Sequence, residues 1–212
     1  DLLQGVTDGL GEKAKQMIVA SASYDTRAPT VESQIVQLRA SGADVLMDFS
    51  TPKFATQAIR KVAELGWKPM HFVASVGSHV GSVLKPAGFE NSKGVITGHW
   101  VKDPNDPAMN DDAGVKEWRG FMDKYYPRGD KLDTLNVAAY VEGQIMAEVL
   151  RRCGANLMRK TFLAKATSLG DWKAPMLRDS VVVRTDPGNY DIFRSMQLLR
   201  FDGEQNKAIA VP

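Results

Sequence analysis

Short apolar runs of strand length alternate with helical stripes along the first hundred residues. The runs fall at 43–49, 70–74 and 95–100. After the first run, Pro52 suits the opening position of a helix, and Ala55, Ile59 and Val62 then recur at helical spacing. Strands that alternate with helices in this way predict a parallel sheet with crossover helices, so the predicted fold class is α/β.

The segments before the first of these runs follow the same pattern. Apolar residues at helical spacing predict a helix over residues 2–10, and residues 16–22 (QMIVASA) predict a short buried strand. A helix with Val31, Ile35 and Leu38 on one face comes next. The run at 43–49 (ADVLMDF) is apolar enough for a strand covered on both faces.

Helix predominates after a Pro- and Asp-rich stretch at 102–107 (KDPNDP), which we interpret as a lobe boundary. The predicted helices contain a stripe of Val115, Trp118, Met122 and Tyr125, a long helix over 134–153 that stops at Gly154, and a third helix over 158–168. Strands are predicted over 181–184 and 196–201. The face formed by Trp118, Phe121, Tyr125 and Tyr126 is expected to pack in the core or between helices.

Composition narrows the classes of function. The 212 residues contain 27 Lys and Arg against 25 Asp and Glu, a net charge of +2, which does not favour nucleic acid as a partner. The one cysteine, Cys153, excludes an internal disulfide, and its place at a helix C-terminus favours a buried structural thiol. No apolar run reaches the roughly 18 residues of a membrane span, and no leader opens the chain.

No catalytic, metal or cofactor motif stands out. The three histidines, His71, His79 and His99, lack the paired spacing of a metal site. An acidic loop could suggest a calcium site, but it lacks the alternating ligands, central Gly and closing Glu of an EF-hand. We expect it to be solvated and to cap a helix. Its acids are Asp103, Asp106, Asp111 and Asp112. We therefore predict no catalytic residues, no metal and no cofactor.

Two strand ends are the candidate ligand site. In an open parallel sheet, ligands bind beyond the carboxyl ends of the strands. Phe49, Ser50 and Thr51 combine an aromatic ring, two hydroxyls and a helix N-terminus, although Ser50 or Thr51 could serve as an ordinary helix cap. The segment Ala74–Ser78 (ASVGS) follows the next strand and should lie beside it, although it could be only a flexible connection.

Several segments resemble type I periplasmic solute-binding proteins of the branched-chain amino acid ABC transporter family, in their later portion. The segments are 34–49 (QIVQLRASGADVLMDF), 51–69 (TPKFATQAIRKVAELGWKP), 80–88 (VGSVLKPAG), 116–127 (KEWRGFMDKYYP), 140–154 and 196–203 (MQLLRFDG). The resemblance implies a hinge-closing receptor with two lobes, each a parallel sheet flanked by helices. Residues 1–98 would form the second lobe, 99–185 a mainly helical return segment of an incomplete first lobe, and 186–212 a strand crossing back plus a tail.

Carried over from that family, the ligand contacts are Phe49, Ser50, Thr51, Ser75, Val76 and Gly77. The resemblance also implies a periplasmic protein that binds a small-molecule ligand and docks on a membrane permease. Family members that bind amino acids place an acid in the second loop, and Ala74–Ser78 has none. An unpaired buried ammonium is costly, so an aromatic or aliphatic carboxylate, or an amide, is the expected solute.

Three alternatives stay open on the sequence alone. The same fold could serve a ligand-sensing regulator instead of a transporter. An α/β hydrolase-type enzyme would need a nucleophile and base at the strand ends, where Ser50, Ser75 and Ser78 are the candidate nucleophiles and His79 the one candidate base. A helical segment without its partner strands would expose an apolar face, so the chain is expected to be either a fragment of a longer protein or paired with another chain, for example as a homo-oligomer.

Overall fold

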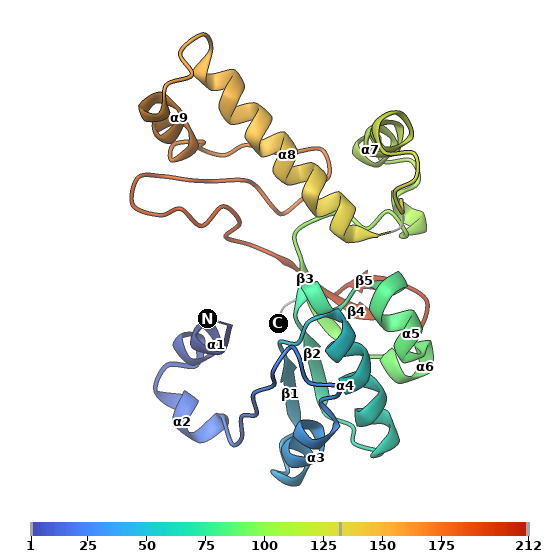
Figure 1. The fold of residues 1–212 in the computed structure, drawn as a ribbon. Helices are drawn as coiled ribbons and strands as arrows, with labels where there is room; N and C mark the ends of the chain where they lie inside the picture. The colour runs from blue at the N-terminus through green and yellow to red at the C-terminus, as the bar shows by residue number, and fades with distance from the viewer. Residues whose placement is uncertain (1, 132, 211–212) are drawn as a thin grey trace. The chain divides into compact units, whose positions relative to one another are not determined.

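A computed structural model describes residues 2–131 and 133–210 (Figure 1). The chain divides into two compact units. The first unit runs up to Thr97 and also includes Arg200–Glu204, and the second contains Gly98–Leu199 and the residues from Gln205 onward. Each unit is described below by itself.

The first unit contains short strands and the helices that connect them. Its helices are α1 (Leu2–Leu10), α2 (Ala14–Met17), α3 (Glu32–Ala40), α4 (Pro52–Glu64), α5 (Lys85–Ala87) and α6 (Phe89–Ser92). Shorter helical turns are η1 (Gly11–Lys13), η2 (Ser75–Gly77) and the π-helical η3 (Val80–Leu84). The strands are β1 (Val45–Asp48), β2 (Met70–Val73) and β3 (Ile96–His99), which continues into the second unit.

The sheet has the order β1-β2-β3-β4-β5, where β4 is Gln197–Phe201 and β5 is Asn206–Ala208. The pairs β1–β2 and β2–β3 are parallel, as the alternation of strands and helices predicts. Only four residues join β4 to β5, too few for a parallel crossover, so this pair is antiparallel. The sheet is therefore mixed, with helices flanking its parallel part.

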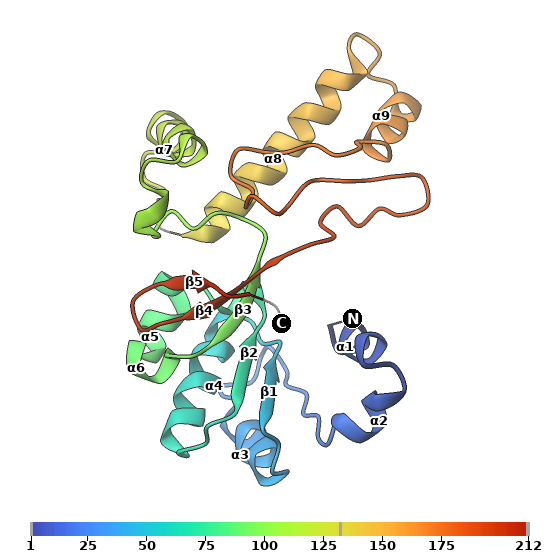
Figure 2. The same ribbon diagram turned by 180° about the vertical axis from the view of Figure 1, so that it is seen from behind.

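Helices α3, α4, α5 and α6 lie on one side of β1 and β2 in both ribbon views (Figures 1 and 2). On that side Phe54 and Ile59 of α4 are fully buried against neighbours such as Leu46 and Val73. The opposite side is open: Val45, Met47 and Met70 keep 43, 41 and 52% of their surface exposed. The prediction that this first run is covered on both faces is wrong, because its side chains alternate between buried and exposed.

The strand predicted over 16–22 is also wrong. Helix α2 extends to Met17, and residues 18–23 form no regular structure. Met17 and Val19 each remain 59% exposed, so the apolar run does not gain the burial that a central strand would give it. The helix predicted over 2–10 is present as α1, which buries none of its residues.

The second unit is built around two helices and a long irregular segment. Its helices are α7 (Ala113–Tyr125), α8 (Thr134–Cys153), α9 (Arg159–Ala166) and the short η4 (Pro107–Met109). Val115 and Trp118 of α7 and Val137 and Val141 of α8 are fully buried. Apart from further residues of these two helices and Val101, the buried core comes from residues 169–183, which contain no regular element.

Two predictions for the second unit need correction. The strand expected over 181–184 is absent, and Val183 makes only isolated bridges, to Trp172 and to Phe193. Tyr125, placed on the buried stripe by its spacing, is 63% exposed because it is the last residue of α7, where the helix leaves the core. In the part of the chain that the structure describes, no helix is long and apolar enough to cross a membrane.

Candidate functional site

The two predicted loops lie side by side at the ends of β1 and β2. These strands are in parallel register, with Asp48 opposite Val73, and the ladder continues where the Ala74 amide donates to the Asp48 carbonyl at 2.9 Å. Both strands therefore end at the same edge of the sheet. The chain leaves β1 through Phe49–Thr51 and leaves β2 through Ser75–Gly77, which forms the short helical turn η2.

Gly77 is the point of closest approach between the loops. A Cβ atom at this position would lie 2.8 Å from the Ser50 carbonyl oxygen and 3.0 Å from the Cβ of Ala55. Neither neighbour is the movable end of a flexible side chain, so any larger residue would push the loops apart. A glycine is needed here for space, and its burial shows that the second loop is a packed turn and not a flexible connection.

The Asp48 carboxylate organises the first loop. Its Oδ1 atom accepts hydrogen bonds from the Ser50 amide at 2.9 Å and from the Ser50 hydroxyl at 2.5 Å. Ser50 is consequently turned inward and only 5% exposed. Of the predicted contacts in this loop, Ser50 serves the architecture of the loop, while Phe49 is half-buried and Thr51 is exposed.

Thr51 holds the entrance to α4 through its backbone. Its carbonyl accepts from the amides of Phe54 and Ala55, both at 2.9 Å, whereas its side chain makes no capping hydrogen bond. The Thr51 amide donates to the Tyr24 hydroxyl at 2.9 Å, and the Tyr24 ring packs on Phe54 with centroids 4.8 Å apart. The Thr51 hydroxyl therefore remains available at the surface of the loop.

In the second loop, the side chains that reach solvent are those of Val76 and, in part, Ser75. Val76 is 40% exposed, and Ser75 is half-buried. Below them, the buried Ser78 hydroxyl hydrogen-bonds to the Ser75 carbonyl at 3.0 Å and to the Thr97 hydroxyl at 2.8 Å. These bonds hold the turn in place. The Val76 side chain and the hydroxyls of Ser75 and Thr51 are therefore presented at the same edge of the sheet.

Asp48 and Tyr24 are parts of this site that the sequence did not reveal. The sequence pattern places Asp48 inside a strand and predicts no role for it. The pattern that could have identified it is an Asp two residues before a Ser at a strand end, because an Asp side chain often hydrogen-bonds to the backbone two residues further along. Tyr24 lies 27 residues before Thr51 in a segment without regular structure. No local sequence pattern predicts a contact over this separation.

A buried histidine lies next to this carboxylate. The Nε2 atom of His71 is 3.7 Å from Oδ2 of Asp48, and the two side chains are 8 and 7% exposed. Neither of these two atoms has a hydrogen-bond partner among the described residues. The order in space is serine, carboxylate, histidine, so the imidazole does not reach the Ser50 hydroxyl as a general base would.

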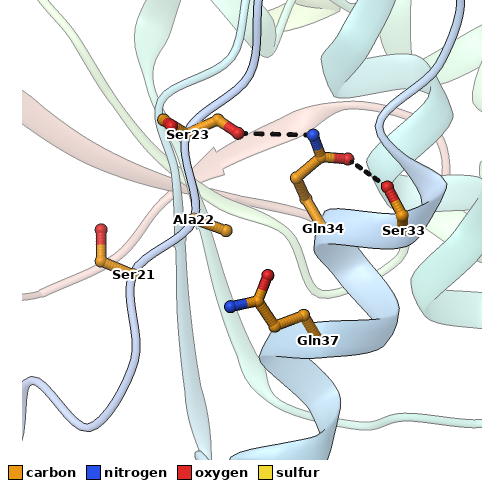
Figure 3. A pocket seen from close by; sticks show the side chains of 6 residues that line it. All are labelled: Ser21, Ala22, Ser23, Ser33, Gln34 and Gln37. Carbon is orange, nitrogen blue, oxygen red and sulfur yellow. Dashed lines mark hydrogen bonds between the residues drawn. The ribbon is translucent and has the colours of Figure 1, made fainter.

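A polar recess of about 310 Å³ lies elsewhere in the first unit, between the segment after α2 and helix α3 (Figure 3). It is lined by Ser21, Ala22, Ser23, Ser33, Gln34 and Gln37. The Gln34 amide nitrogen donates to the Ser23 carbonyl at 3.3 Å, and its oxygen accepts from the Ser33 hydroxyl at 2.9 Å. Solute pockets are lined mainly by apolar groups, and this recess has a single alanine, so the strand ends are the better candidate.

The acidic loop has a structural role. Asp106 and Asp112 accept from backbone amides at the starts of η4 and α7, which is the capping expected of them. Asp112 also pairs with Lys102 at 2.7 Å, and this pairing helps to lower its pKa despite the opposing effect of desolvation. Asp103 is buried rather than solvated, and accepts two hydrogen bonds from Asn105. Among residues 2–131 and 133–210, no three metal-ligating side chains come together.

Comparisons with known proteins identify a family by sequence profile and a fold by structural superposition. The sequence profile described as periplasmic binding protein matches residues 1–204. A search of curated proteins finds no matching relative. A substrate-binding periplasmic protein from Ralstonia solanacearum superimposes with a TM-score of 0.75 at 18% identity, covering 96% of this chain and 57% of that one.

A branched-chain amino acid ABC transporter protein from Thermus thermophilus, solved with bound valine, gives a TM-score of 0.73 at 12% identity. The match covers 89% of this chain and 50% of that one. At such identities the likeness shows the fold alone. The chain thus spans about half the length of the structures it resembles.

Proposed function

Because the chain belongs to the periplasmic binding protein family, we propose that it is the solute-binding part of an ABC transporter receptor, working in the periplasm. In this proposal it captures a small organic solute by hinge closure and presents it to a membrane permease. The observation that carries the proposal is the close packing of Gly77 against the Ser50 carbonyl, which places the two strand-end loops side by side at one edge of the sheet. Hinge closure needs only a solute that binds the closed state better than the open one.

The solute that we propose is an aromatic or aliphatic carboxylate, or an amide. Phe49 and Val76 offer apolar contact, while the Thr51 hydroxyl and the N-terminal end of α4 favour an oxygen with negative or partial negative charge. Asp48, the acid at the end of β1, is buried and already accepts from Ser50, so it is not positioned to pair with a ligand ammonium. A free α-amino acid would leave its ammonium unpaired in this loop.

Nuclear magnetic resonance titration suits a test with the 212-residue chain, because it detects weak binding. We expect phenylacetate or isovalerate to shift the amide signals of Ser75, Val76 and Gly77, with smaller effects from leucine or valine. Val76→Glu should abolish the shifts, whereas Val36→Glu, which alters a valine on α3 that is 47% exposed, should leave them intact.

Three other results would count against parts of this proposal. Shifts caused by leucine and valine but not by the acids would overturn the proposed solute class and leave the site standing. Shifts that follow another surface, with none at either loop, would overturn the site itself. Hydrolysis of a test ester that is lost in Ser75→Ala would instead support an enzyme.

A further inference from the structure

A buried carboxylate and a buried imidazole lie side by side beneath the first loop of the candidate site. Leu46 and His71 are partners in the β1–β2 register, and Asp48 follows two residues after Leu46, so Asp48 and His71 point to the same face of the sheet. This face carries the buried residues of both strands. The imidazole and carboxylate side chains are 8 and 7% exposed, so a charge on either of them is largely withdrawn from water.

The two atoms that face each other lack a hydrogen bond in this geometry. Nε2 of His71 is 3.7 Å from Oδ2 of Asp48, and neither atom has a partner among the described residues. This separation exceeds the roughly 2.7–3.2 Å of a hydrogen bond, and a water between the atoms would need roughly 5.5 Å, the length of two such bonds. An unpaired buried polar atom is costly. A movement of about 1 Å by the imidazole would give both atoms a partner.

Protonation decides how favourable that movement is. A neutral imidazole either faces Oδ2 of Asp48 with a bare Nε2, which is a second acceptor, or donates from Nε2 without a charge. A doubly protonated ring donates as a cation to an anion, which gives the stronger bond, and the attraction is larger where water is excluded. Histidine is the side chain whose charge ordinarily changes between about pH 5 and 8. Proton uptake by His71 therefore favours the closed contact.

Other charged groups around this pair are directed elsewhere. In the described part of the chain, Asp48 is the ion-pair partner of His71, and Asp44 lies just before β1, at the opposite end from Asp48. The basic side chains of α4 contact other oxygen atoms: Lys53 the Ala28 carbonyl, Arg60 the Pro86 carbonyl, and Lys61 the carboxylates of Glu32 and Glu64. The remaining charged residues of α3, α5 and α6 are exposed, namely Arg39, Lys85 and Glu90. The other two histidines, His79 and His99, are buried beyond β2 and at the end of β3.

Asp48 connects this contact to the candidate site. Its Oδ1 atom accepts from the Ser50 amide and hydroxyl, and the Ser50 carbonyl is the atom against which Gly77 packs. A charged His71 on Oδ2 keeps the carboxylate ionised and in the orientation that accepts from Ser50. The loop Phe49–Thr51 is therefore held more firmly when His71 carries a proton.

We propose that His71 is a positioning residue of the candidate site: on gaining a proton it closes on Asp48 and holds the Ser50 turn in the orientation that receives the solute. This inference rests on the proposed function. A solute that binds better to the held turn must, by linkage, also favour protonation of His71. The dissociation constant of phenylacetate should accordingly be roughly fivefold or more lower at about pH 5.5 than at about pH 8.

The decisive test needs no solute. In nuclear magnetic resonance spectra of the 212-residue chain, recorded from about pH 8 to about pH 5, the Ser50 amide signal should move together with the ring signals of His71. The Leu135 amide is a matched control, because it donates to Oδ1 of Asp133 at 2.9 Å, as the Ser50 amide does to Asp48. No histidine pairs with Asp133 among the described residues, so the Leu135 signal should not follow any ring.

Two variants separate positioning from packing. His71→Gln keeps a neutral donor near the place of Nε2, so the Ser50 signal should lose its pH response while phenylacetate still binds. His71→Leu removes the donor, so the response should be lost and binding should weaken at low pH. A Ser50 signal that does not follow His71, or that responds to pH in His71→Leu as in the unmodified chain, overturns the inference. If phenylacetate does not bind at all, the proposed function fails, while the solute-free spectra still decide whether His71 controls the turn.

Discussion

The two units of this molecule bury their cores with different kinds of structure. In the first unit, α4 sets Phe54 and Ile59 against a parallel pair of strands, so both sides of the contact are regular. In the second unit, Trp118 and its neighbours on α7 and α8 pack against irregular chain, including Met176 and Leu177, which are fully buried. Equal burial therefore does not require equal regularity of the backbone.

The largest expected effect comes from removing the central side chain of the irregular core. Trp118 is fully buried, and its indole nitrogen has no hydrogen-bond partner among the described residues, so its contribution is packing. Trp118→Ala should lower the free energy of unfolding by about 3–5 kcal/mol. Hydrogen exchange should rise in the second unit while the β1–β2 amides stay protected.

Phe121→Ala on the same helix is the control, because Phe121 is 40% exposed and should cost far less. Equal loss of protection in both units of the Trp118 variant would show that the two cores unfold as one, which would remove the basis for contrasting them.

The first unit should also be sensitive at a buried position that has no side chain, Gly77. In Gly77→Ala the new methyl group would lie 2.8 Å from the Ser50 carbonyl, which forces the two loops apart. We expect a loss of about 1–3 kcal/mol, measured by urea denaturation. Gly81→Ala, where a Cβ meets nothing within 4 Å, should be close to neutral, and equal losses at the two glycines would refute the close packing of the loops.

Low pH should destabilise the second unit, because the ionised Glu148 carboxylate stabilises it. Hydrogen bonds from Arg151 and Arg152 lower the pKa of this carboxylate from 4.5 to about 2. A lowered pKa contributes stability that is present above the unfolded-state value and is lost as pH falls from about 4.5 toward 2.

Thermal melts across this range should therefore show a fall in the stability of the second unit that is reduced in Glu148→Gln. A pH profile that is identical in the two proteins would mean that the arginine pair does not hold the carboxylate ionised.

The smallest effect is expected at an ion pair on the surface of the irregular segment. Arg184 and Asp171 form a bidentate contact at 2.6 and 2.8 Å, but both side chains are about half exposed. A double-mutant cycle with Arg184→Gln and Asp171→Asn should give a coupling below about 1 kcal/mol. A larger value would mean that ion pairs, and not only packing, stabilise the irregular core.

Local sequence patterns predicted the regular elements well. The apolar runs that became β1, β2 and β3, Pro52 at the start of α4, and the length of α8 all follow from rules that act over a few residues. The run at 16–22 misled the prediction because an apolar sequence becomes a strand only where a neighbour pairs with it. The core contributed by residues 169–183 has no period, so periodicity could not locate it.

In the candidate site, too, some features could be predicted from the sequence and others could not. Its position at two strand ends follows from the topology of a parallel sheet, which points to Phe49–Thr51 and Ala74–Ser78, while the choice of Ser75, Val76 and Gly77 came from the family resemblance. The inward turn of Ser50 toward Asp48 and the bond from Thr51 to Tyr24 depend on side-chain directions and on a contact across 27 residues. Such contacts are fixed by the tertiary structure and leave little trace in local spacing.

The position of Phe201 in the sequence determines when the core of the first unit can be completed during synthesis. This side chain is fully buried among Val73 and Val95, and its backbone pairs with Gly94 and Val95, yet about a hundred residues separate it from Thr97. A ribosome that adds roughly 5–20 residues per second needs roughly 5–20 seconds to supply it after Thr97. Until Phe201 is supplied, the nascent first unit has an incomplete core, and the apolar side chains that pack on Phe201, such as Val73 and Val95, lack this partner.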